Sequence, residues 1–585
     1  MKAYLEAIKR NLTEEDKEFL LAIYEPTVVA VQPSDANRGL CVTDDGEIRI
    51  YGVTGKNEPD EEGEPVYIAS RDGGLSWKQH KVADRRALGS AGHNPETGRY
   101  ISAYPNEYRR DKKRIMALEG SYAELARGYD DTDVRYVKLT DEHIHILKKP
   151  IYLERYGRWY ILGEKRCDDG EKYAVLFLSD DDGESFREVV LENAPRFEMT
   201  PPHASVRWQE DSCEPSLVEL QDGRLMILVR TSQDYHYVHY SEDGGDSWTA
   251  PAPSRFHGTI TMPVLERLSD GRVVLFWCNT QPMPELDKSR VYPPLDADEC
   301  SGRWEDVFTN RDANHLAITS DGETWRGFRE LALNPIRNNA DFRSVGGRDT
   351  RDKSVHQAEL LELPYNKLLV SYGQNSASRR VVILDLDWLY ETERSEDFRH
   401  GMQNISTQMY VRSNLGNYRG FSGHCAYNRT NGALLVPDPD GNFEEALCIR
   451  RVEDDALVYK KQGAVWNYPA TKQGSVSVRL MRLGAGVRIS LLDRWLNPAD
   501  EYASEYAFVS VDTDSLPRGV WQDVELRYDT EAMTAELLVN GEPRGIIAAR
   551  CPSENGLSYL HIQTLAETED TDGTLIKHLE KKDLG

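Results

Sequence analysis

The sequence predicts an all-β protein: a six-bladed β-propeller, followed by an antiparallel β-sandwich of the jelly-roll type and preceded by a short helical segment. Two repeats within the 585 residues predict the propeller, because self-similar units at a regular spacing indicate a fold built from repeated blades. Alternating apolar residues nearer the C-terminus predict the sandwich. The expected boundaries are 1–24 for the helical segment, 25–395 for the propeller and 396–585 for the sandwich.

The first repeat is a short acidic turn with the pattern Ser-x-Asp-x-Gly-x-x-aromatic. In such a turn the Asp accepts hydrogen bonds from nearby backbone N–H groups, and the Gly adopts a positive φ. The aromatic side chain packs into the sheet beneath. The four copies are Ser70–Trp77, Ser179–Phe186, Ser241–Trp248 and Thr319–Trp325, of which the last is one residue shorter.

The second repeat is a tight turn followed by a run of apolar residues. Such a run suits the inner strand of a blade, which its neighbours bury on both faces. The repeat occurs six times, which predicts six blades, and acidic turns follow the first, third, fourth and fifth copies. The turns are Asp45-Gly46, Gly98-Arg99, Gly157-Arg158, Gly223-Arg224, Gly271-Arg272 and Asn366-Lys367.

The two ends of the chain read differently from the repeats. Residues 1–20 predict a short amphipathic helix and then a second helix capped near Thr13. Toward the C-terminus, apolar alternation predicts strands at 475–480, 487–491, 506–511, 524–528 and 535–539. The charged tail from Glu567 to Gly585 is expected to be frayed or a short helix.

Composition narrows the class of partner and the compartment. The formal net charge of −27 and the pI near 5.0 disfavour nucleic acid and anionic membranes as partners. No run of 18 apolar residues predicts a membrane-spanning helix, and no apolar run of signal length lies near the N-terminus. Eight dispersed cysteines without a CxxC pair indicate buried free thiols and a cytoplasmic protein. No motif for a metal or a cofactor is found.

The acidic turn resembles the Asp-box, or bacterial neuraminidase repeat, of the sialidase superfamily. The resemblance implies a six-bladed propeller with the boxes on its rim, away from the active site. The stretches 519–528 and 535–541 look like the concanavalin-like jelly rolls attached to many glycosidases. Such a domain binds sugar or buttresses the catalytic domain, and it could also join two copies of the chain into a homo-oligomer.

The resemblance also implies two site residues. The segment 211–230 is similar to a sialidase stretch in which a Glu opens an inner strand and an Arg ends the next. By position, Glu214 would be a catalytic carboxylate and Arg230 would bind the carboxylate of the substrate. A guanidinium matches a carboxylate in a bidentate way. The structural alternative is a salt bridge that holds two adjacent strands together.

The rest of the sialidase pattern is poorly met. Arg38 would have to supply the first triad arginine from a shifted position, and Asp35 is a candidate acid. Gln357 stands where the family has its nucleophilic tyrosine, so a mechanism with a tyrosine nucleophile is not expected. His356 beside it is instead a candidate general base, although a histidine that caps the strand is the structural alternative.

Other loops offer further candidates for substrate binding. The segment 343–352 holds three arginines around a Gly-Gly pair, and Arg348 or Arg343 could complete the carboxylate clamp. A charged surface loop is the alternative. His257 lies in a segment that precedes an inner strand, and Glu164 follows the inner strand at 159–163. His257 is a candidate residue for substrate binding.

These observations predict a glycoside hydrolase that releases a terminal, acidic sugar from a glycan. Without the tyrosine, direct attack by water and inversion are expected. Two alternatives stay open. One is a propeller lyase or glycosidase that uses His and Arg at a uronate or rhamnoside linkage. The other is a non-catalytic glycan-binding propeller.

Overall fold

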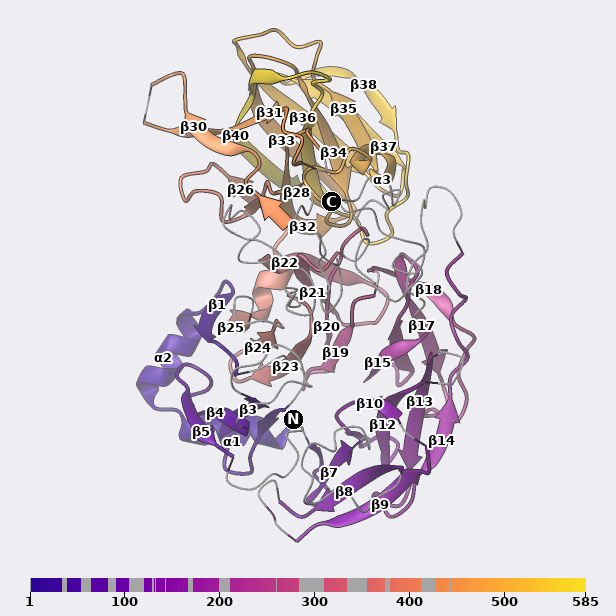
Figure 1. Cartoon of the computed structure of the whole chain (residues 1–585). Helices are drawn as coiled ribbons and strands as arrows, with labels where there is room; N and C mark the ends of the chain where they lie inside the picture. The colour runs from indigo at the N-terminus through magenta and orange to yellow at the C-terminus, as the bar shows by residue number, and fades with distance from the viewer. Residues whose placement is uncertain are drawn as a thin grey trace.

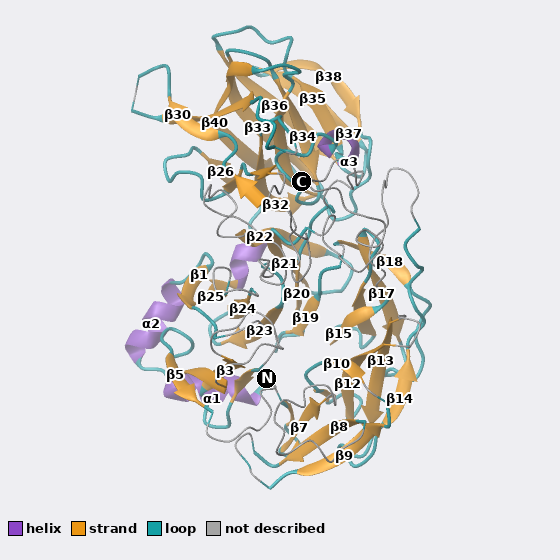
Figure 2. Cartoon of the chain, viewed as in Figure 1, coloured by secondary structure: helices purple, strands orange, loops and turns teal. Residues whose placement is uncertain are grey.

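The computed structural model describes most of the chain as an all-β protein with antiparallel strand pairing. The described residues are 2–33, 39–53, 65–82, 91–104, 120–128, 131, 133–142, 144–166, 172–198, 211–258, 260–282, 310–333, 355–373, 379–411, 428–441, 443–457 and 459–585. Figures 1 and 2 show two groups of sheets, with the N-terminal helices against the first group.

The first group consists of six sheets that follow one another along the chain. Sheet 1 holds β2 (Leu40–Val42), β3 (Ile48–Val53), β4 (Pro65–Ser70) and β5 (Lys78–Lys81). Sheet 2 holds β6 (Gly92–Asn94), β7 (Arg99–Tyr104), β8 (Ser121–Ala126) and β9 (Arg135–Thr140). Sheet 3 holds β10 (Ile144–Leu147), β11 (Ile151–Leu153), β12 (Arg158–Arg166), β13 (Lys172–Ser179) and β14 (Arg187–Val190).

Sheets 4 to 6 repeat this strand order. Sheet 4 holds β15 (Cys213–Glu219), β16 (Leu225–Arg230), β17 (Tyr235–Ser241) and β18 (Ala252–His257). Sheet 5 holds β19 (Val264–Arg267), β20 (Val273–Trp277), β21 (Ala313–Thr319) and β22 (Trp325–Leu333). Sheet 6 holds β23 (Ala358–Leu363), β24 (Lys367–Tyr372) and β25 (Arg380–Asp385), and its outer strand is β1 (Thr27–Ala30) from the N-terminus. The start and the end of this region therefore pair in one sheet.

The N-terminal helices are confirmed. α1 spans Ala3–Asn11 and α2 spans Glu14–Ala22, and Thr13 and Asp16 form a capping box at the start of α2. Ile8 and Leu20 are buried in an apolar cluster shared by sheets 1 and 6. The helices therefore cover the place where the first and the last of the six sheets meet.

The C-terminal region consists mainly of two further antiparallel sheets. The larger holds β26 (Arg394–Glu396), β30 (Leu434–Pro437), β31 (Glu445–Arg451), β33 (Gln473–Arg482), β36 (Trp521–Asp529), β37 (Thr534–Val539), β38 (Glu542–Ala548) and β40 (Asp570–Asp583). The smaller holds β27 (Ile405–Ser406), β32 (Gly463–Thr471), β34 (Val487–Leu492), β35 (Val509–Asp512) and β39 (Leu557–Thr564). The pair β28 (Met409–Val411) and β29 (Asn428–Thr430), the short helix α3 (Ala503–Tyr506) and a 3-10 turn at Leu386–Tyr390 complete the elements. One apolar cluster contains side chains from both large sheets.

The expectation for the C-terminal tail is wrong. The segment Asp570–Asp583 is the long strand β40, which pairs with β31 on one side and β33 on the other. Its buried residues include Leu575, Ile576 and Leu579. Lys581 is buried as well, and its ammonium donates a hydrogen bond to the carbonyl of Thr392. The charges of the tail concealed this apolar strand. The expected strand at 506–511 also begins later, at Val509, after α3.

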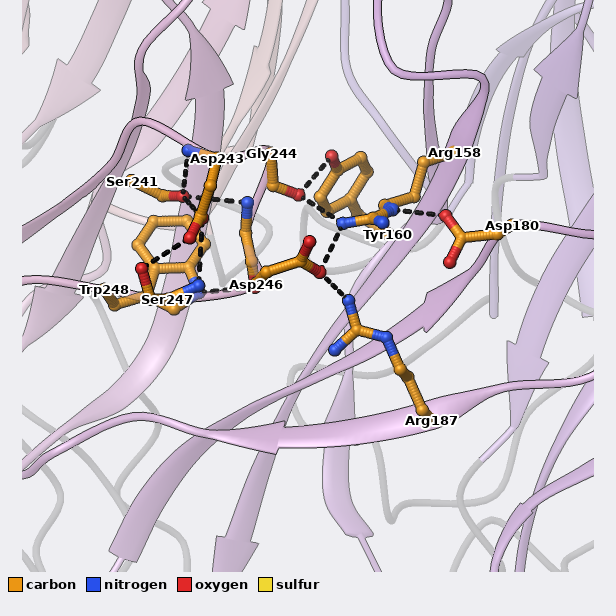
Figure 3. Close-up of polar contacts among 11 residues, drawn as sticks. Arg158, Tyr160, Asp180, Arg187, Ser241, Asp243, Gly244, Asp246, Ser247 and Trp248 are labelled. Carbon is orange, nitrogen blue, oxygen red and sulfur yellow. Dashed lines mark hydrogen bonds and ion pairs between the residues drawn. The ribbon is translucent and has the colours of Figure 1, made fainter.

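The acidic turns have the predicted hydrogen bonding. In the third copy, shown in Figure 3, Asp243 accepts from the hydroxyl of Ser241 at 2.8 Å, and from the backbone N–H and hydroxyl of Ser247 at 2.9 and 2.5 Å. Gly245 has a φ of 91°, and the Trp248 indole N–H donates to its carbonyl at 3.1 Å. Each copy lies between the last two strands of its sheet, in sheets 1, 3, 4 and 5.

The two sequence repeats contact each other across neighbouring sheets. Arg158, in the Gly-Arg turn of sheet 3, donates to the Gly244 carbonyl and to the Asp246 carboxylate in the acidic turn of sheet 4, both at 2.8 Å (Figure 3). The equivalent contacts are Arg99 to Glu184 at 2.8 Å, between sheets 2 and 3, and Arg224 to Glu323 at 2.9 Å, between sheets 4 and 5. The repeats therefore hold successive sheets together.

We predict that Asp243→Ala destabilises the protein by about 1–3 kcal/mol, because it leaves the N–H of Ser247 without its charged acceptor. Hydrogen bonds from Ser247 and Ser241 outweigh the effect of burial and hold the pKa of Asp243 at about 2. The stabilisation is present above pH ~4 and is lost as the pH falls toward 2. Thermal unfolding at pH 7 and pH 3 checks both points. The neighbouring exposed Glu242→Ala serves as control, and an equal loss in both variants would contradict the prediction.

Candidate functional site

The strand register separates the two ends of the six sheets. In sheet 4 the acidic turn follows Ser241, which pairs with Leu225, and Leu225 pairs with Glu219. Cys213 pairs with Arg230 at the opposite end of the same two strands. Glu214 and Arg230 therefore lie at the end of the sheet that faces away from the acidic turns.

Glu214 and Arg230 form a buried ion pair. The Arg230 guanidinium donates from Nη1 to Glu214 Oε2 at 2.5 Å, and the two residues are 5% and 7% exposed. Glu214 has a φ of 42°, and the pairing register shifts between Cys213 and Ser216. A bulge of this kind redirects a side chain relative to the regular pleat, and residues in this strained conformation cluster at functional sites.

Lys148, which sequence reasoning missed, adds a second cation to the pair. It follows β10 on sheet 3, and its Nζ lies 3.9 Å from Glu214 Oε1 and 2.8 Å from the thioether sulfur of Met262. Burial lowers the pKa of Lys148, although Glu214 and Glu164 oppose the shift. Lys148 is one of two adjacent lysines in the phrase Leu-Lys-Lys-Pro, and this phrase matches no motif for such a site.

A second ion pair lies beside this cluster. Lys172 at the start of β13 lies 3.8 Å from Glu164 on β12, and both residues are almost fully buried. The charged groups come from four strands, β12, β13, β15 and β16, and from the loop after β10, all of sheets 3 and 4. In this part of the structure, Arg230, Lys148 and Lys172 face two carboxylates, those of Glu214 and Glu164.

His356 and Gln357 lie directly before β23 on sheet 6. His356 is 1% exposed, and its Nε2 lies 3.3 Å from Gln357 Nε2. Gln357 has a φ of 67°, so the chain bends at this position as it does at Glu214. Gln357 directly precedes β23, the first of the consecutive strands of sheet 6, and Glu214 lies at the start of β15, the first strand of sheet 4. The sequence predicts both placements.

Several predicted site residues lie outside the described residues. These are Asp35, Arg38, Arg343 and Arg348. The described part of the chain holds no group of three or more potential metal ligands and no helix long and apolar enough to cross a membrane. Of the cysteines in the same part, Cys41, Cys213, Cys278 and Cys448 are buried free thiols and Cys551 is a partly buried one.

Comparison with known proteins supports the resemblance on one stretch of the chain. Residues 145–371, from β10 to β24, match the family model of the BNR repeat-like domain. We refer to this stretch, residues 145–371, as the BNR repeat-like domain. The match contains three of the four acidic turns and supports their resemblance to the bacterial neuraminidase repeat.

Similar solved structures are remote. A sialidase of Trypanosoma rangeli is 12% identical with a TM-score of 0.36, over 95% of this chain and 92% of that one. An exo-β-1,3-galactanase of Phanerochaete chrysosporium is 8% identical with a TM-score of 0.31, over 95% and 100%. At these scores neither structure decides the fold or the activity of this chain. A search of curated protein sequences gives no match.

His257, a predicted binding residue in the BNR repeat-like domain, contacts the C-terminal region. Its Nε2 lies 2.6 Å from Arg494 Nη1 and 3.2 Å from Asp493 Oδ2, and its ring packs on Tyr235 with centroids 4.6 Å apart. Arg494 also donates to the side chain of Gln281 at 2.8 Å. Residues 493–495 thus hold the C-terminal region against sheets 4 and 5.

This junction responds to acid in two ways. Burial and the neighbouring Arg494 lower the pKa of His257, so the histidine is neutral in the fold. Arg494 and His257 outweigh burial and hold the pKa of Asp493 well below its usual range. Since the unfolded chain binds more protons than the folded one at both groups, stability falls as the pH drops below about 6.5 for His257 and below about 4 for Asp493.

We predict that Asp493→Asn reduces the acid sensitivity of the junction between the BNR repeat-like domain and the C-terminal region. The variant should be destabilised at pH 7, by about 2 kcal/mol or more, because it leaves Arg494 buried without its charged partner. The difference from the wild-type protein should shrink as the pH falls from about 4 to about 2, because protons begin to bind Asp493 in the unfolded wild-type chain near its ordinary pKa. Thermal unfolding across this range measures it, and a constant difference would contradict the assignment.

Proposed function

We propose that the six sheets are the blades of a β-propeller and that the two C-terminal sheets form a jelly-roll sandwich. Support for the propeller comes from apolar clusters that contain side chains of two successive sheets, such as sheets 3 and 4 or sheets 5 and 6. Pairing of β1 with β25 supports a closed ring, since it joins the first and last strands of the region. The cluster shared by the two C-terminal sheets supports the sandwich.

We propose that the chain is a glycoside hydrolase that releases a terminal, acidic sugar from a glycan. The observation that carries the proposal is the buried cluster of Glu214, Arg230 and Lys148, at the ends of the sheets opposite the acidic turns. Among the described residues, Arg230 and Lys148 lie 2.5 and 3.9 Å from the Glu214 carboxylate, in a protein whose net charge is −27. A local excess of positive charge suits an anionic substrate group, because it reverses the sign of the surrounding field.

In this proposal each group has a chemical role. Arg230 holds the Glu214 carboxylate in an ion pair, and a positioned carboxylate can act as the general base that activates water. Gln357 occupies the position of the family's nucleophilic tyrosine and has no nucleophilic atom, so water attacks the anomeric carbon directly and the configuration inverts. His356, buried beside Gln357, is the candidate for the second proton transfer, to the leaving oxygen.

The test is a screen of the purified protein against chromogenic α-sialosides, uronides and rhamnosides. Glu214→Gln should lower kcat on the productive substrate by about 10²–10⁴-fold. Glu219→Gln is the matched control. Glu219 is an equally buried carboxylate at the opposite end of the same strand, β15, and its Oε1 lies 3.0 Å from Nε of Arg155. NMR of the released sugar gives the stereochemistry.

The other outcomes separate the alternatives. Activity confined to uronides or rhamnosides and abolished by His356→Ala, with Glu214→Gln still active, would favour a mechanism based on His and Arg. Loss of activity in Glu219→Gln equal to that in Glu214→Gln would point to a structural role for both pairs. No turnover with any substrate, while sugars still bind, would favour a glycan-binding protein.

A further inference from the structure

Lys148 is unusual because it is largely buried and, among the residues that the structure describes, its nearest charged partner is Glu214, 3.9 Å away. Its side chain is 18% exposed. A lysine ammonium has three N–H donors, but its closest contact is the Met262 thioether sulfur, a weak acceptor. The Glu214 carboxylate is 3.9 Å away, beyond ordinary hydrogen-bond length.

The position of Glu214 explains why Lys148 is left in this state. The 2.5 Å contact with Arg230 holds Oε2 of Glu214 on the guanidinium, and the bulge at Cys213–Ser216 fixes where the side chain begins. Glu214 therefore binds one cation closely and the other only at a distance. A desolvated ammonium that lacks a strong acceptor is unfavourable, and an incoming carboxylate would remove this penalty.

We propose that Lys148 is the specificity-determining residue for the carboxylate of the sugar, which it binds together with Arg230. The inference rests on the proposed site but names the group that distinguishes a carboxylated sugar from its neutral analogue. A uronic acid and a nonulosonic acid share this carboxylate, so either class of sugar fits. A neutral hexose offers no charge to the ammonium and gains nothing from it.

The same arrangement couples binding to a proton. Burial lowers the pKa of Lys148 in the free protein; the charged groups that act on it are Glu214 and Glu164, which raise the pKa, Arg230, which lowers it, and Cys213 as a thiolate, which would raise it. A bound carboxylate favours the ammonium form and therefore raises the pKa again. Above the pKa of the free protein, carboxylate binding takes up a proton, so affinity falls as the pH rises.

Isothermal titration calorimetry with free N-acetylneuraminic acid, glucuronic acid and neutral glucose tests this proposal. Lys148→Met should weaken binding of the carboxylated sugar by at least about tenfold, the usual effect of losing a charge-assisted hydrogen bond, and should leave glucose unchanged. Lys149→Met is the control, since it removes the same charge from the next residue, which is exposed and donates to the Leu40 carbonyl at 3.3 Å. Circular dichroism checks that both variants are folded.

A second readout distinguishes a direct contact from a structural effect. In the wild-type protein, the binding enthalpy at alkaline pH, below the ordinary lysine pKa of about 10.4, should depend on the ionisation enthalpy of the buffer, because a proton is taken up. Lys148→Met should lose this dependence and Lys149→Met should keep it. If Lys148→Met misfolds, selective protection of Lys148 from acetylation by the sugar, read by mass spectrometry in the wild-type protein, replaces the variant.

The outcomes separate this inference from the proposed hydrolase. Carboxylated sugars that bind through Lys148 without turnover would support the subsite and overturn the hydrolase. Turnover of a glycoside with equal affinity in Lys148→Met and the wild-type protein would keep the hydrolase and overturn the subsite. Failure of every carboxylated sugar to bind at millimolar concentration would also overturn the subsite.

Discussion

The packing of each sheet against the next is the constraint on which the rest of the structure depends. A four-stranded sheet of apolar strands has two faces to bury, and here neighbouring sheets bury them against each other. The acidic turns belong to this packing. A Cβ on Gly245 would lie 3.2 Å from the ring of Tyr160 on the preceding sheet, and one on Gly183 would lie 2.5 Å from Ile101. A side chain at these positions would require the neighbouring side chain on the preceding sheet to move, and the positive φ of both glycines disfavours any residue with a Cβ.

This packing also explains why the charged cluster stands at the opposite end. The turns with Gly, Arg and Asp hold the sheets together at one end, where they are exposed and their hydrogen bonds are numerous. At the other end, the buried pair of Glu214 and Arg230 carries a desolvation cost that a salt bridge seldom recovers. Apolar residues of similar volume often stabilise a buried site as well as an ion pair does, so stability by itself does not account for this pair.

Hydrogen bonds and an ion pair join the C-terminal region to the BNR repeat-like domain. Arg494 and Asp493 reach His257 on sheet 4, and Trp495 exchanges backbone hydrogen bonds with Asn279 and Gln281, which follow β20 of sheet 5. Asn467 of β32 donates to the Phe328 carbonyl of β22 at 3.0 Å. These contacts are buried and directional, which is typical of a fixed junction. The C-terminal region thus approaches sheets 4 and 5 near the ends that carry the candidate site.

The sequence by itself determined the elements that local patterns specify. The acidic turns, the six apolar strands and the capping box at Thr13 depend on residues a few positions apart, and all are present. The placement of Glu214 and Arg230 at the ends of adjacent strands was also predictable, because register follows from a short hairpin. Only the tertiary structure decided the rest, because contacts between residues far apart in the chain leave no local pattern. Lys148 from sheet 3 meets Glu214 from sheet 4, His257 meets Arg494 of the C-terminal region, and the charged tail becomes a central strand because β31 and β33 bury it.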